Sequence, residues 1–124
     1  MGYLLVFLGG GLGSMARYGL SVFGMRLVGQ GFPWPTLLIN IAGSAFMGLL
    51  TGWLAVQGNA PQALRLFIAT GILGGFTTFS TFSLETVLLY ERGQAGLAVA
   101  YVAASVAVGV AALFIAMRLA RGMA

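Results

Sequence analysis

The sequence contains no cysteine, histidine, lysine or aspartate, and only two of its 124 residues are acidic. Without cysteine and histidine it has no disulfides, no thiol chemistry, no histidine general base and no soft-metal ligand set. Without lysine it cannot form a Schiff base. Its serines lack both a G-x-S-x-G elbow and a partner base. These absences predict that the protein is not an enzyme.

Charge of either sign is also scarce. Charged residues make up 6% of the chain and hydrophobic residues 60%, whereas a soluble domain carries about 25% charged residues. A chain of this composition cannot cover its surface with polar groups, so we expect lipid to be its solvent. The six arginines form no basic run or patch, which argues against a nucleic-acid partner. The sequence contains no complete nucleotide-binding motif either.

The length and the apolar runs predict an all-α membrane protein with four transmembrane helices, since each span needs roughly 20 apolar residues. We expect a single transmembrane domain over residues 1–124, with helices at about 3–28, 35–56, 62–90 and 94–117. An unbroken helix over residues 62–90 would be about 44 Å long, which exceeds the hydrocarbon thickness of a bilayer. We therefore expect a break between Gly74 and Thr77, because glycine is permissive and threonine is a modest helix former. Such a break frees carbonyl groups that must bind protein, water or an ion.

The first predicted helix combines close-packing glycines with a charge. Gly9 and Gly13 form a GxxxG pair that allows close contact between helices. The run from Gly9 to Ser14 is similar to a dinucleotide-binding loop, but no strand precedes it and no acidic residue follows at the required distance. Arg17 lies well inside the span. It needs a carboxylate, helix C-terminal carbonyls or a water-filled cavity as its partner.

The second predicted helix has a polar stripe. Thr36, Asn40, Ser44 and Thr51 fall within about one quadrant of the helical wheel. Hydroxyls can bond to the backbone one turn back, whereas the Asn40 amide must find several partners. Asn40 is therefore either an interhelical hydrogen-bonding residue or a donor that lines a pore.

The most unusual stretch is GGFTTFSTFS at residues 74–83, which is followed by Glu85. Hydroxyls and a carboxylate cost free energy in hydrocarbon unless they have partners or face water. Thr81, Phe82 and Glu85 gather on one side of a helix, with Phe79 on the adjacent side. Phenylalanine in a membrane helix normally packs, but the positive ring edges of phenylalanines among hydroxyls can contact an anion. The residues thus indicate a polar, anion-related path.

The distribution of arginines gives little preference for one orientation in the membrane. Four spans would place Arg65, Arg118 and Arg121 on one side and Arg26 and Arg92 on the other, a weak positive-inside bias. Insertion in both orientations would allow an antiparallel dimer. A four-helix chain of this size also has little room for an internal pore, which favours an oligomer.

The central stretch together with Leu84, Glu85 and Thr86 resembles the signature of the bacterial fluoride channels, the Fluc or CrcB family. The resemblance extends over essentially the whole chain. It includes the segment from Gly13 to Tyr18, the segment from Thr36 to Asn40, and Tyr101 with Ser105 four residues later in the last helix. It implies an antiparallel, dual-topology homodimer with two pores in the bacterial inner membrane, which exports fluoride passively.

The resemblance also implies roles for individual residues. Asn40, Phe79 and Phe82 would line the fluoride path, with Ser80, Thr81, Glu85, Tyr101 and Ser105 as a supporting polar track. A structural sodium ion would be held by backbone oxygens of Gly74 and Thr77 from both chains. Arg17 and Thr36 would be structural polar residues.

Two alternatives come from other classes of protein. A small dual-topology multidrug or cation exporter also has four helices. The mechanism of such an exporter resembles proton–cation exchange on a glutamate in the first helix. Here the first helix has Arg17 and no acidic residue. A structural assembly subunit would use its glycines only for packing, and would leave Asn40 and the hydroxyl cluster without a purpose.

Overall fold

The computed structural model describes residues 1–29 and 31–123, without the side chain of residue 123, and every regular element in them is helical. This confirms the predicted all-α fold. The elements are α1 (Gly2–Val28), α2 (Trp34–Gln57), α3 (Gln62–Leu64), the π-helix η1 (Arg65–Leu73), α4 (Gly74–Phe76), α5 (Phe79–Glu91) and α6 (Ala95–Met123). These bounds lie close to the predicted ones, except that α6 continues past residue 117. The single-domain organisation stays a prediction.

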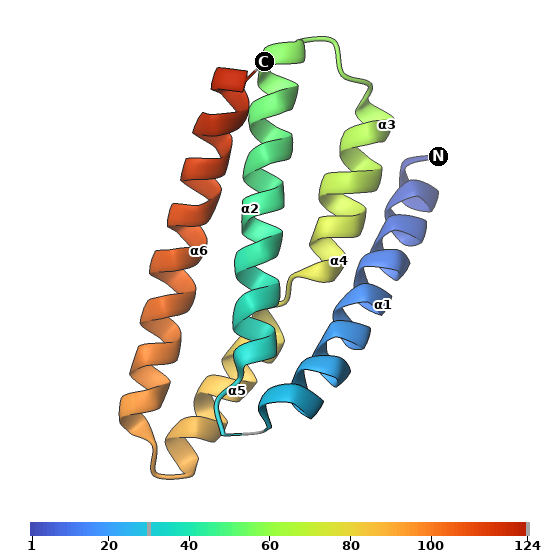
Figure 1. The fold of residues 1–124 in the computed structure, drawn as a ribbon. Helices are drawn as coiled ribbons and strands as arrows, with labels where there is room; N and C mark the ends of the chain where they lie inside the picture. Colours follow the sequence, from blue (N-terminus) through green and yellow to red (C-terminus); the bar gives the residue numbers. More distant parts are fainter. Residues whose placement is uncertain (30, 124) are drawn as a thin grey trace.

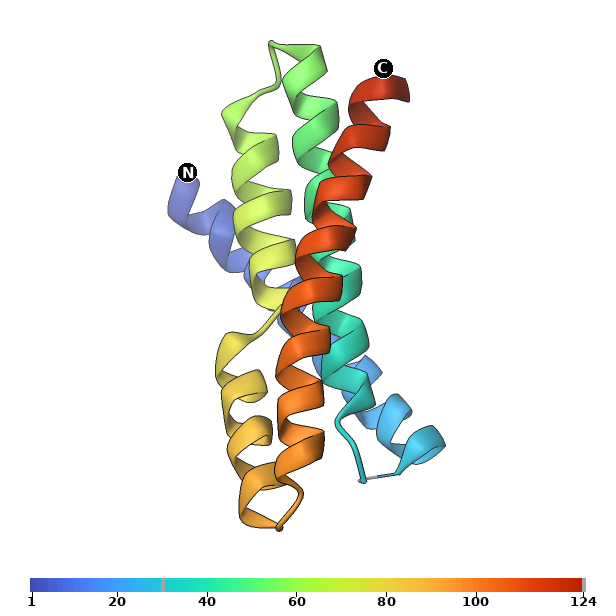
Figure 2. The ribbon, with the colours of Figure 1, turned by 90° about the vertical axis from the view of Figure 1, so that its left-hand side faces the viewer.

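The helices form two associated groups. α2 and α6 lie side by side along most of their length, while α1 packs against η1 and α4 (Figures 1 and 2). α5 packs against the first half of α6. The end of α6 lies beside the turn between α2 and α3, the start of α1 lies beside α3 in the same half of the molecule, and the α5–α6 turn lies at the opposite end (Figure 1). This is the arrangement expected of helices that pass back and forth across one layer.

Glycines set the distance between neighbouring helices. A Cβ atom on Gly13 would collide with the carbonyl oxygen of Ile72 in η1, and a Cβ atom on Gly9 would collide with the carbonyl oxygen of Phe67. The predicted close contact at this GxxxG pair is therefore confirmed. A second such pair, Gly48 and Gly52 in α2, lies against the backbone of α6, and the sequence analysis did not single it out.

The third span is interrupted, but not where the glycines are. Gly74 and Gly75 remain helical, and the backbone becomes extended at Thr77 (φ −87°, ψ 156°) and Thr78 (φ −150°, ψ 123°). Gly75 packs on α1, where an added Cβ would lie 2.5 Å from the carbonyl oxygen of Gly10. The glycine thus serves close packing. The break falls on threonines because β-branched residues favour extended backbone.

The helix before the break also differs from the expected α-helix. Arg65–Leu73 has π-helical hydrogen bonding, and the Gly74 N–H continues the pattern by donating to the Ala69 carbonyl five residues back. π-Helical turns are rare and are frequently found at functional sites. Here the π-helix leads directly into the break.

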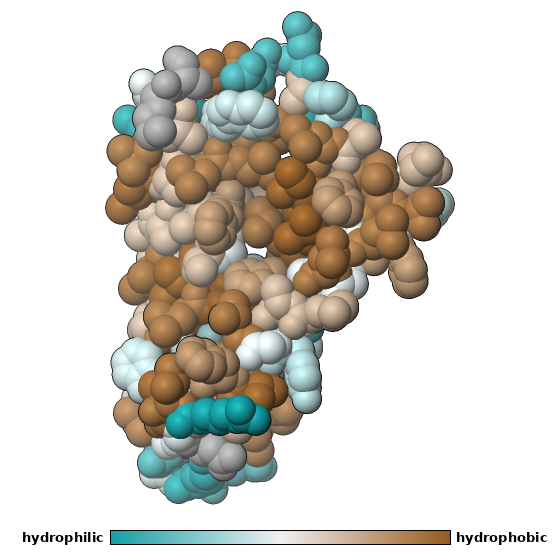
Figure 3. Space-filling model, turned by 45° about the vertical axis from the view of Figure 1, so that its right-hand side comes forward, coloured by the Kyte–Doolittle hydropathy of each residue, from teal (hydrophilic) through white to brown (hydrophobic). Residues whose placement is uncertain are grey.

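The exterior is suited to lipid. Within residues 1–29 and 31–123, three stretches are long and apolar enough to cross a membrane: Trp34–Gln57, Gln62–Glu91 and Ala95–Gly122. Figure 3 shows a broad apolar band over the middle of the molecule, with hydrophilic groups towards its two ends. The protein is a multi-pass membrane protein. α1 is 27 residues long, but its glycines and Arg17 make it less apolar, and its crossing of the membrane stays a prediction.

A small cluster of buried residues lies where α2, α5 and α6 meet. It contains Leu37, Leu89, Ala98 and Tyr101, of which Leu89 and Tyr101 are fully buried. This core holds the Tyr101 side chain against α5.

Candidate functional site

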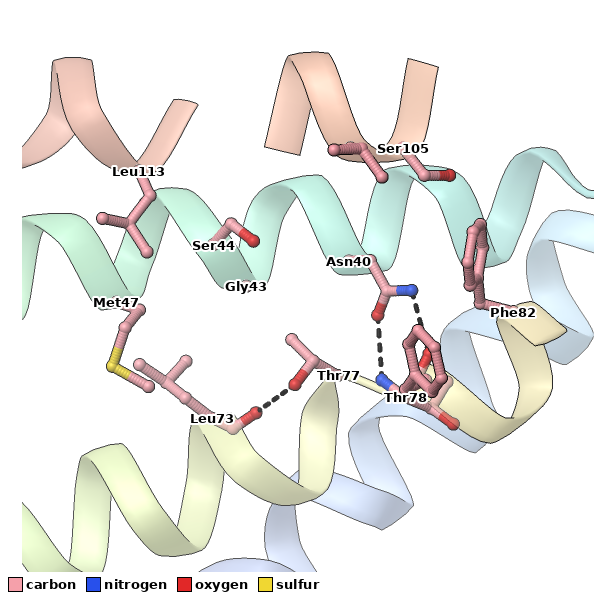
Figure 4. Close-up of a pocket in the computed structure, with 12 residues that line it drawn as sticks. Asn40, Gly43, Ser44, Met47, Leu73, Thr77, Thr78, Phe82, Ser105 and Leu113 are labelled. Carbon is pink, nitrogen blue, oxygen red and sulfur yellow. Dashed lines mark hydrogen bonds between the residues drawn. The ribbon is translucent and has the colours of Figure 1, made fainter. Parts of the chain in front are cut away.

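Asn40 holds the extended backbone at the break. Its amide oxygen accepts the Thr78 N–H at 2.9 Å, and its amide nitrogen donates to the Thr78 carbonyl at 3.0 Å (Figure 4). This double hydrogen bond satisfies both backbone groups of Thr78. The amide nitrogen carries two N–H groups, so one donor of Asn40 is left for another acceptor.

Two carbonyl groups at the break have lost their helical N–H donors. In a continuous α-helix the Thr78 N–H would bond to the Gly74 carbonyl and the Thr81 N–H to the Thr77 carbonyl. Instead, the Thr78 N–H bonds to Asn40, and the Thr81 N–H bonds to the Thr78 hydroxyl at 3.3 Å. Thr78 is therefore the N-cap of α5, a position that threonine favours. The carbonyls of Gly74 and Thr77 lose their ordinary helical donors.

The next carbonyl after that of Gly74, which belongs to Gly75, has partners on α1. It accepts hydrogen bonds from Arg17 Nε at 3.2 Å and from the Ser14 hydroxyl at 3.5 Å. A helix-terminal carbonyl was one of the three possible partners expected for Arg17. The contribution of Ser14 was not predicted, although its position three residues before Arg17 on the helix is a signal that could have indicated it.

A cavity of about 320 Å³, which we call the α2/α6 cavity, lies beside the break. Figure 4 shows that its walls come from α2, the break, α5 and α6. It brings together four of the residues expected on the ion path, namely Asn40, Phe79, Phe82 and Ser105. The other residues that line it are Gly43, Ser44, Met47, Leu73, Thr77, Thr78, Val106 and Leu113. The cavity is thus mainly apolar, with a few polar groups in its walls.

The phenylalanines form a short aromatic series with Tyr101. The ring centroids of Phe79 and Phe82 are 5.7 Å apart, and those of Phe82 and Tyr101 are 5.1 Å apart. Phe79 is 78% exposed, whereas Tyr101 is fully buried. The series therefore runs from the molecular surface into the core.

Beyond Tyr101 lies a second polar cluster. The Tyr101 hydroxyl donates to Glu85 Oε1 at 2.9 Å. Glu85, Thr81 and Thr36 line a separate cavity, the Glu85 cavity, which also touches α1. Phe82 and Tyr101 thus link the residues of the two cavities through ring contact and one hydrogen bond.

Two predicted residues have less typical surroundings. Ser80 is exposed, and its hydroxyl lies 3.4 Å from the Thr78 hydroxyl rather than in either cavity. The Ser105 hydroxyl is buried, and it has no hydrogen-bond partner in the described part of the chain. A buried hydroxyl without a partner carries a free-energy cost, so Ser105 has a donor available for a ligand in the α2/α6 cavity.

Within the described residues, no group of three or more histidine, cysteine, aspartate or glutamate side chains is placed to hold a metal ion. The oxygens that the break itself offers are backbone carbonyls and threonine hydroxyls. The carbonyls of Gly74 and Thr77 are of the oxygen type that hard cations prefer, and their helical donors are engaged elsewhere. The break therefore fits a hard cation better than a soft one.

Comparison with known proteins gives a consistent result. Residues 4–117 match the family described as "CrcB-like protein, Camphor Resistance (CrcB)". The chain is 57% identical to a "Fluoride-specific ion channel FluC" of Beijerinckia indica subsp. indica, over 97% of this chain and 96% of the relative. It is 53% identical to a protein of the same name from Rhodopseudomonas palustris strain BisB5, over 99% of both chains. A third relative with this name, from Methylobacterium nodulans, is 61% identical over 87% of this chain and 86% of its own length.

Proposed function

The chain belongs to the CrcB-like family, which is a family of ion channels and not of enzymes, and from this premise we propose that it is a fluoride-selective channel. It exports fluoride passively from the cytoplasm across the bacterial inner membrane. The prediction that the protein is not an enzyme is confirmed. Relatives that are named fluoride-specific channels and match nearly the full length support the choice of ion.

The observation that carries the proposal is the pair of unused donors in the α2/α6 cavity. The Ser105 hydroxyl is buried without a partner in the described residues, and one N–H of Asn40 remains after its two bonds to Thr78. No acidic side chain lines this cavity. Fluoride holds its water tightly, so a pore must replace that water with donors of this kind. Donors without a competing carboxylate suit an anion.

The aromatic series extends the proposed path. Phe79 and Phe82 would offer their positive ring edges to fluoride, and Phe82 is in contact with the ring of Tyr101. The ion would then pass to the cluster of Glu85, Thr81 and Thr36. Ser80, which is exposed near Thr78, would serve at the rim of the path.

We propose that two chains assemble as an antiparallel homodimer with two pores. The exposure of Phe79 on a wall of the α2/α6 cavity supports this, because a second copy would complete the wall that a single chain leaves open. The nearly even distribution of arginines supports insertion in both orientations.

A structural sodium ion on the dimer axis would complete the proposed assembly, held by the carbonyls of Gly74 and Thr77 from each chain. The N–H groups of Thr78 and Thr81 bond to side chains and not to these two carbonyls. This supports the choice of the carbonyls as ligands. A bound cation lowers the cost of placing an anion in a low-dielectric interior.

Replacement of sodium by N-methylglucamine throughout purification and assay should reduce fluoride flux, because this cation is too large for a cage of carbonyls. Flux that is independent of the cation would contradict the sodium site while leaving the channel proposal intact.

Export through such a channel needs no nucleotide. Undissociated HF crosses membranes and releases fluoride in a neutral cytoplasm. An inside-negative potential then drives the anion outwards with about 2.3 kcal/mol per charge per 100 mV. The absence of a nucleotide-binding motif in the sequence agrees with this mechanism.

The decisive test is fluoride efflux from proteoliposomes, with chloride as the control ion. We expect rapid fluoride efflux and little chloride efflux. Fluoride flux no faster than from protein-free vesicles would refute the channel. Proton-driven uptake of quaternary cations in the same vesicles would instead support the multidrug exporter, against which the presence of Arg17 and the absence of an acidic residue in the first helix argue.

A further inference from the structure

We propose that Ser44 is a further fluoride-binding residue. Its hydroxyl, the Ser105 hydroxyl and the free N–H of Asn40 together form a three-donor subsite in the α2/α6 cavity. The inference rests on the proposed channel function and deepens it, because it assigns a contact to a residue of α2 that the path described above does not use.

The first argument is the unused hydroxyl of Ser44. Serine and threonine hydroxyls in membrane helices ordinarily bond to a carbonyl one turn back. Three hydroxyls near the break do so: Thr77 to Leu73, Ser83 to Phe79 and Thr86 to Phe82, at 3.0, 3.0 and 2.8 Å. Ser44 makes no such bond, and no hydrogen bond of its hydroxyl is found within the described residues. Ser44 and Ser105 are therefore two hydroxyls that line the same cavity and keep their donors free.

The second argument is position. Ser44 follows Asn40 by one turn of α2, and both line the α2/α6 cavity (Figure 4). Ser105 lines the same cavity from α6. An ion that leaves the Asn40 N–H along α2 would next meet the Ser44 hydroxyl.

The third argument is the absence of a side chain on α6 next to Ser44. A Cβ atom added to the buried Gly109 would lie in van der Waals contact with the Ser44 hydroxyl oxygen, at 3.8 Å. The glycine thus leaves a gap about the size of one methyl group beside this hydroxyl. The neighbouring lining residues Met47, Leu73 and Leu113 are apolar, so they offer the hydroxyl no competing acceptor from their side chains.

The chemistry of the subsite favours a small anion. Asn40 has already used its amide oxygen on Thr78, so it presents only a donor. Neither serine hydroxyl donates a hydrogen bond to an acceptor within the described residues. The residues that line the cavity include no carboxylate that could attract a cation. Three donors on two neighbouring helices can replace part of the water shell of fluoride.

The test is fluoride efflux from proteoliposomes with a double-mutant cycle at positions 44 and 109. Ser44→Ala should lower fluoride flux about tenfold, the effect of losing one hydrogen bond to a charged ligand. In that background, Gly109→Ser should restore most of the flux, because it returns a hydroxyl to the same gap from α6. Gly109→Ala in the same background should stay low, since it adds the Cβ without the hydroxyl.

A control on the same helix is Thr51→Val, which removes an exposed hydroxyl outside the α2/α6 cavity and should conduct normally. Wild-type protein without fluoride flux would refute the proposed function itself. If the wild type conducts, equal flux in Ser44→Ala overturns the inference alone. Loss of flux that Gly109→Ser does not restore assigns Ser44 to packing and overturns it as well.

Discussion

Single residues at the break have partners that are mostly backbone atoms. Arg17 donates to the Gly75 carbonyl, and Asn40 bonds to both backbone groups of Thr78. A charge and an amide inside a membrane protein require such partners. The two side chains therefore stabilise a broken helix whose backbone groups lipid could not satisfy.

Arg17→Met should destabilise the fold, because it leaves the Gly75 carbonyl with only the weaker contact to Ser14. The expected cost is about 1–3 kcal/mol, visible as a lower melting temperature of the purified protein in detergent. Arg26→Met is the matched control, since Arg26 is exposed in the last turn of α1. Equal melting temperatures for the two variants would show that the Gly75 contact does not stabilise the break.

Phe82→Ile should reduce fluoride flux by about tenfold or more, because it removes the ring edge between Phe79 and Tyr101. Efflux from proteoliposomes measures the effect. Phe46→Ile is a suitable control, since Phe46 is 57% exposed on α2 and does not line the α2/α6 cavity. Unchanged flux in Phe82→Ile would leave Phe82 with a packing role only.

Asn40 illustrates what could be predicted at this scale. Its place in a polar quadrant of the second helix indicated an interhelical bond or a pore-lining donor. The structure provides the interhelical bond and leaves one N–H free for the second role. The sequence could not identify Thr78 as the partner, because that depends on where a different helix breaks.

At the scale of elements, the interrupted third span is the central feature. Its length and composition predicted a break, and the break is present. The predicted range ran from Gly74 to Thr77, and the extended residues are Thr77 and Thr78 at its end. The sequence could not tell that the glycines themselves stay helical, because Gly75 is needed for contact with α1 and a contact partner cannot be read from the local sequence.

Gly13→Ala should disrupt the contact between α1 and η1, because the new methyl group would collide with the Ile72 carbonyl. Overpacking of this kind costs about 1–3 kcal/mol, and we expect a lower melting temperature in detergent. Gly11→Ala is the control on the same helix, where nothing lies within 4 Å of an added Cβ. Its higher helix propensity should leave stability unchanged or slightly raised. A Gly13→Ala variant as stable as Gly11→Ala would contradict close packing at this contact.

At the scale of the whole molecule, the two halves of the third span join the α1 group to the α2/α6 pair. The end of α6 and the α2–α3 turn lie at one end, and the α5–α6 turn lies at the other (Figure 1). Because the sequence has no cysteine, a single introduced cysteine can report which end faces which side of the membrane.

Asn59→Cys and Gln94→Cys place an exposed cysteine at the two opposite ends. If the chain inserts in both orientations, a membrane-impermeant maleimide added to intact spheroplasts should label about half of each variant. Permeabilised cells give the value for complete labelling. Labelling of one variant alone would demonstrate a single orientation and would refute the dual-topology proposal.

The sequence by itself determined the helical, lipid-facing character of the protein, the interruption of the third span and the polar residue types near it, because these follow from composition and local periodicity. Only the tertiary structure decided that Thr77 and Thr78 are extended while the glycines before them stay helical, which partners Asn40 and Arg17 have, and that Ser44 and Ser105 line one cavity. The physical reason is separation along the chain. Asn40 meets a residue 38 positions away and Arg17 one 58 positions away, and such contacts depend on how the helices pack against each other.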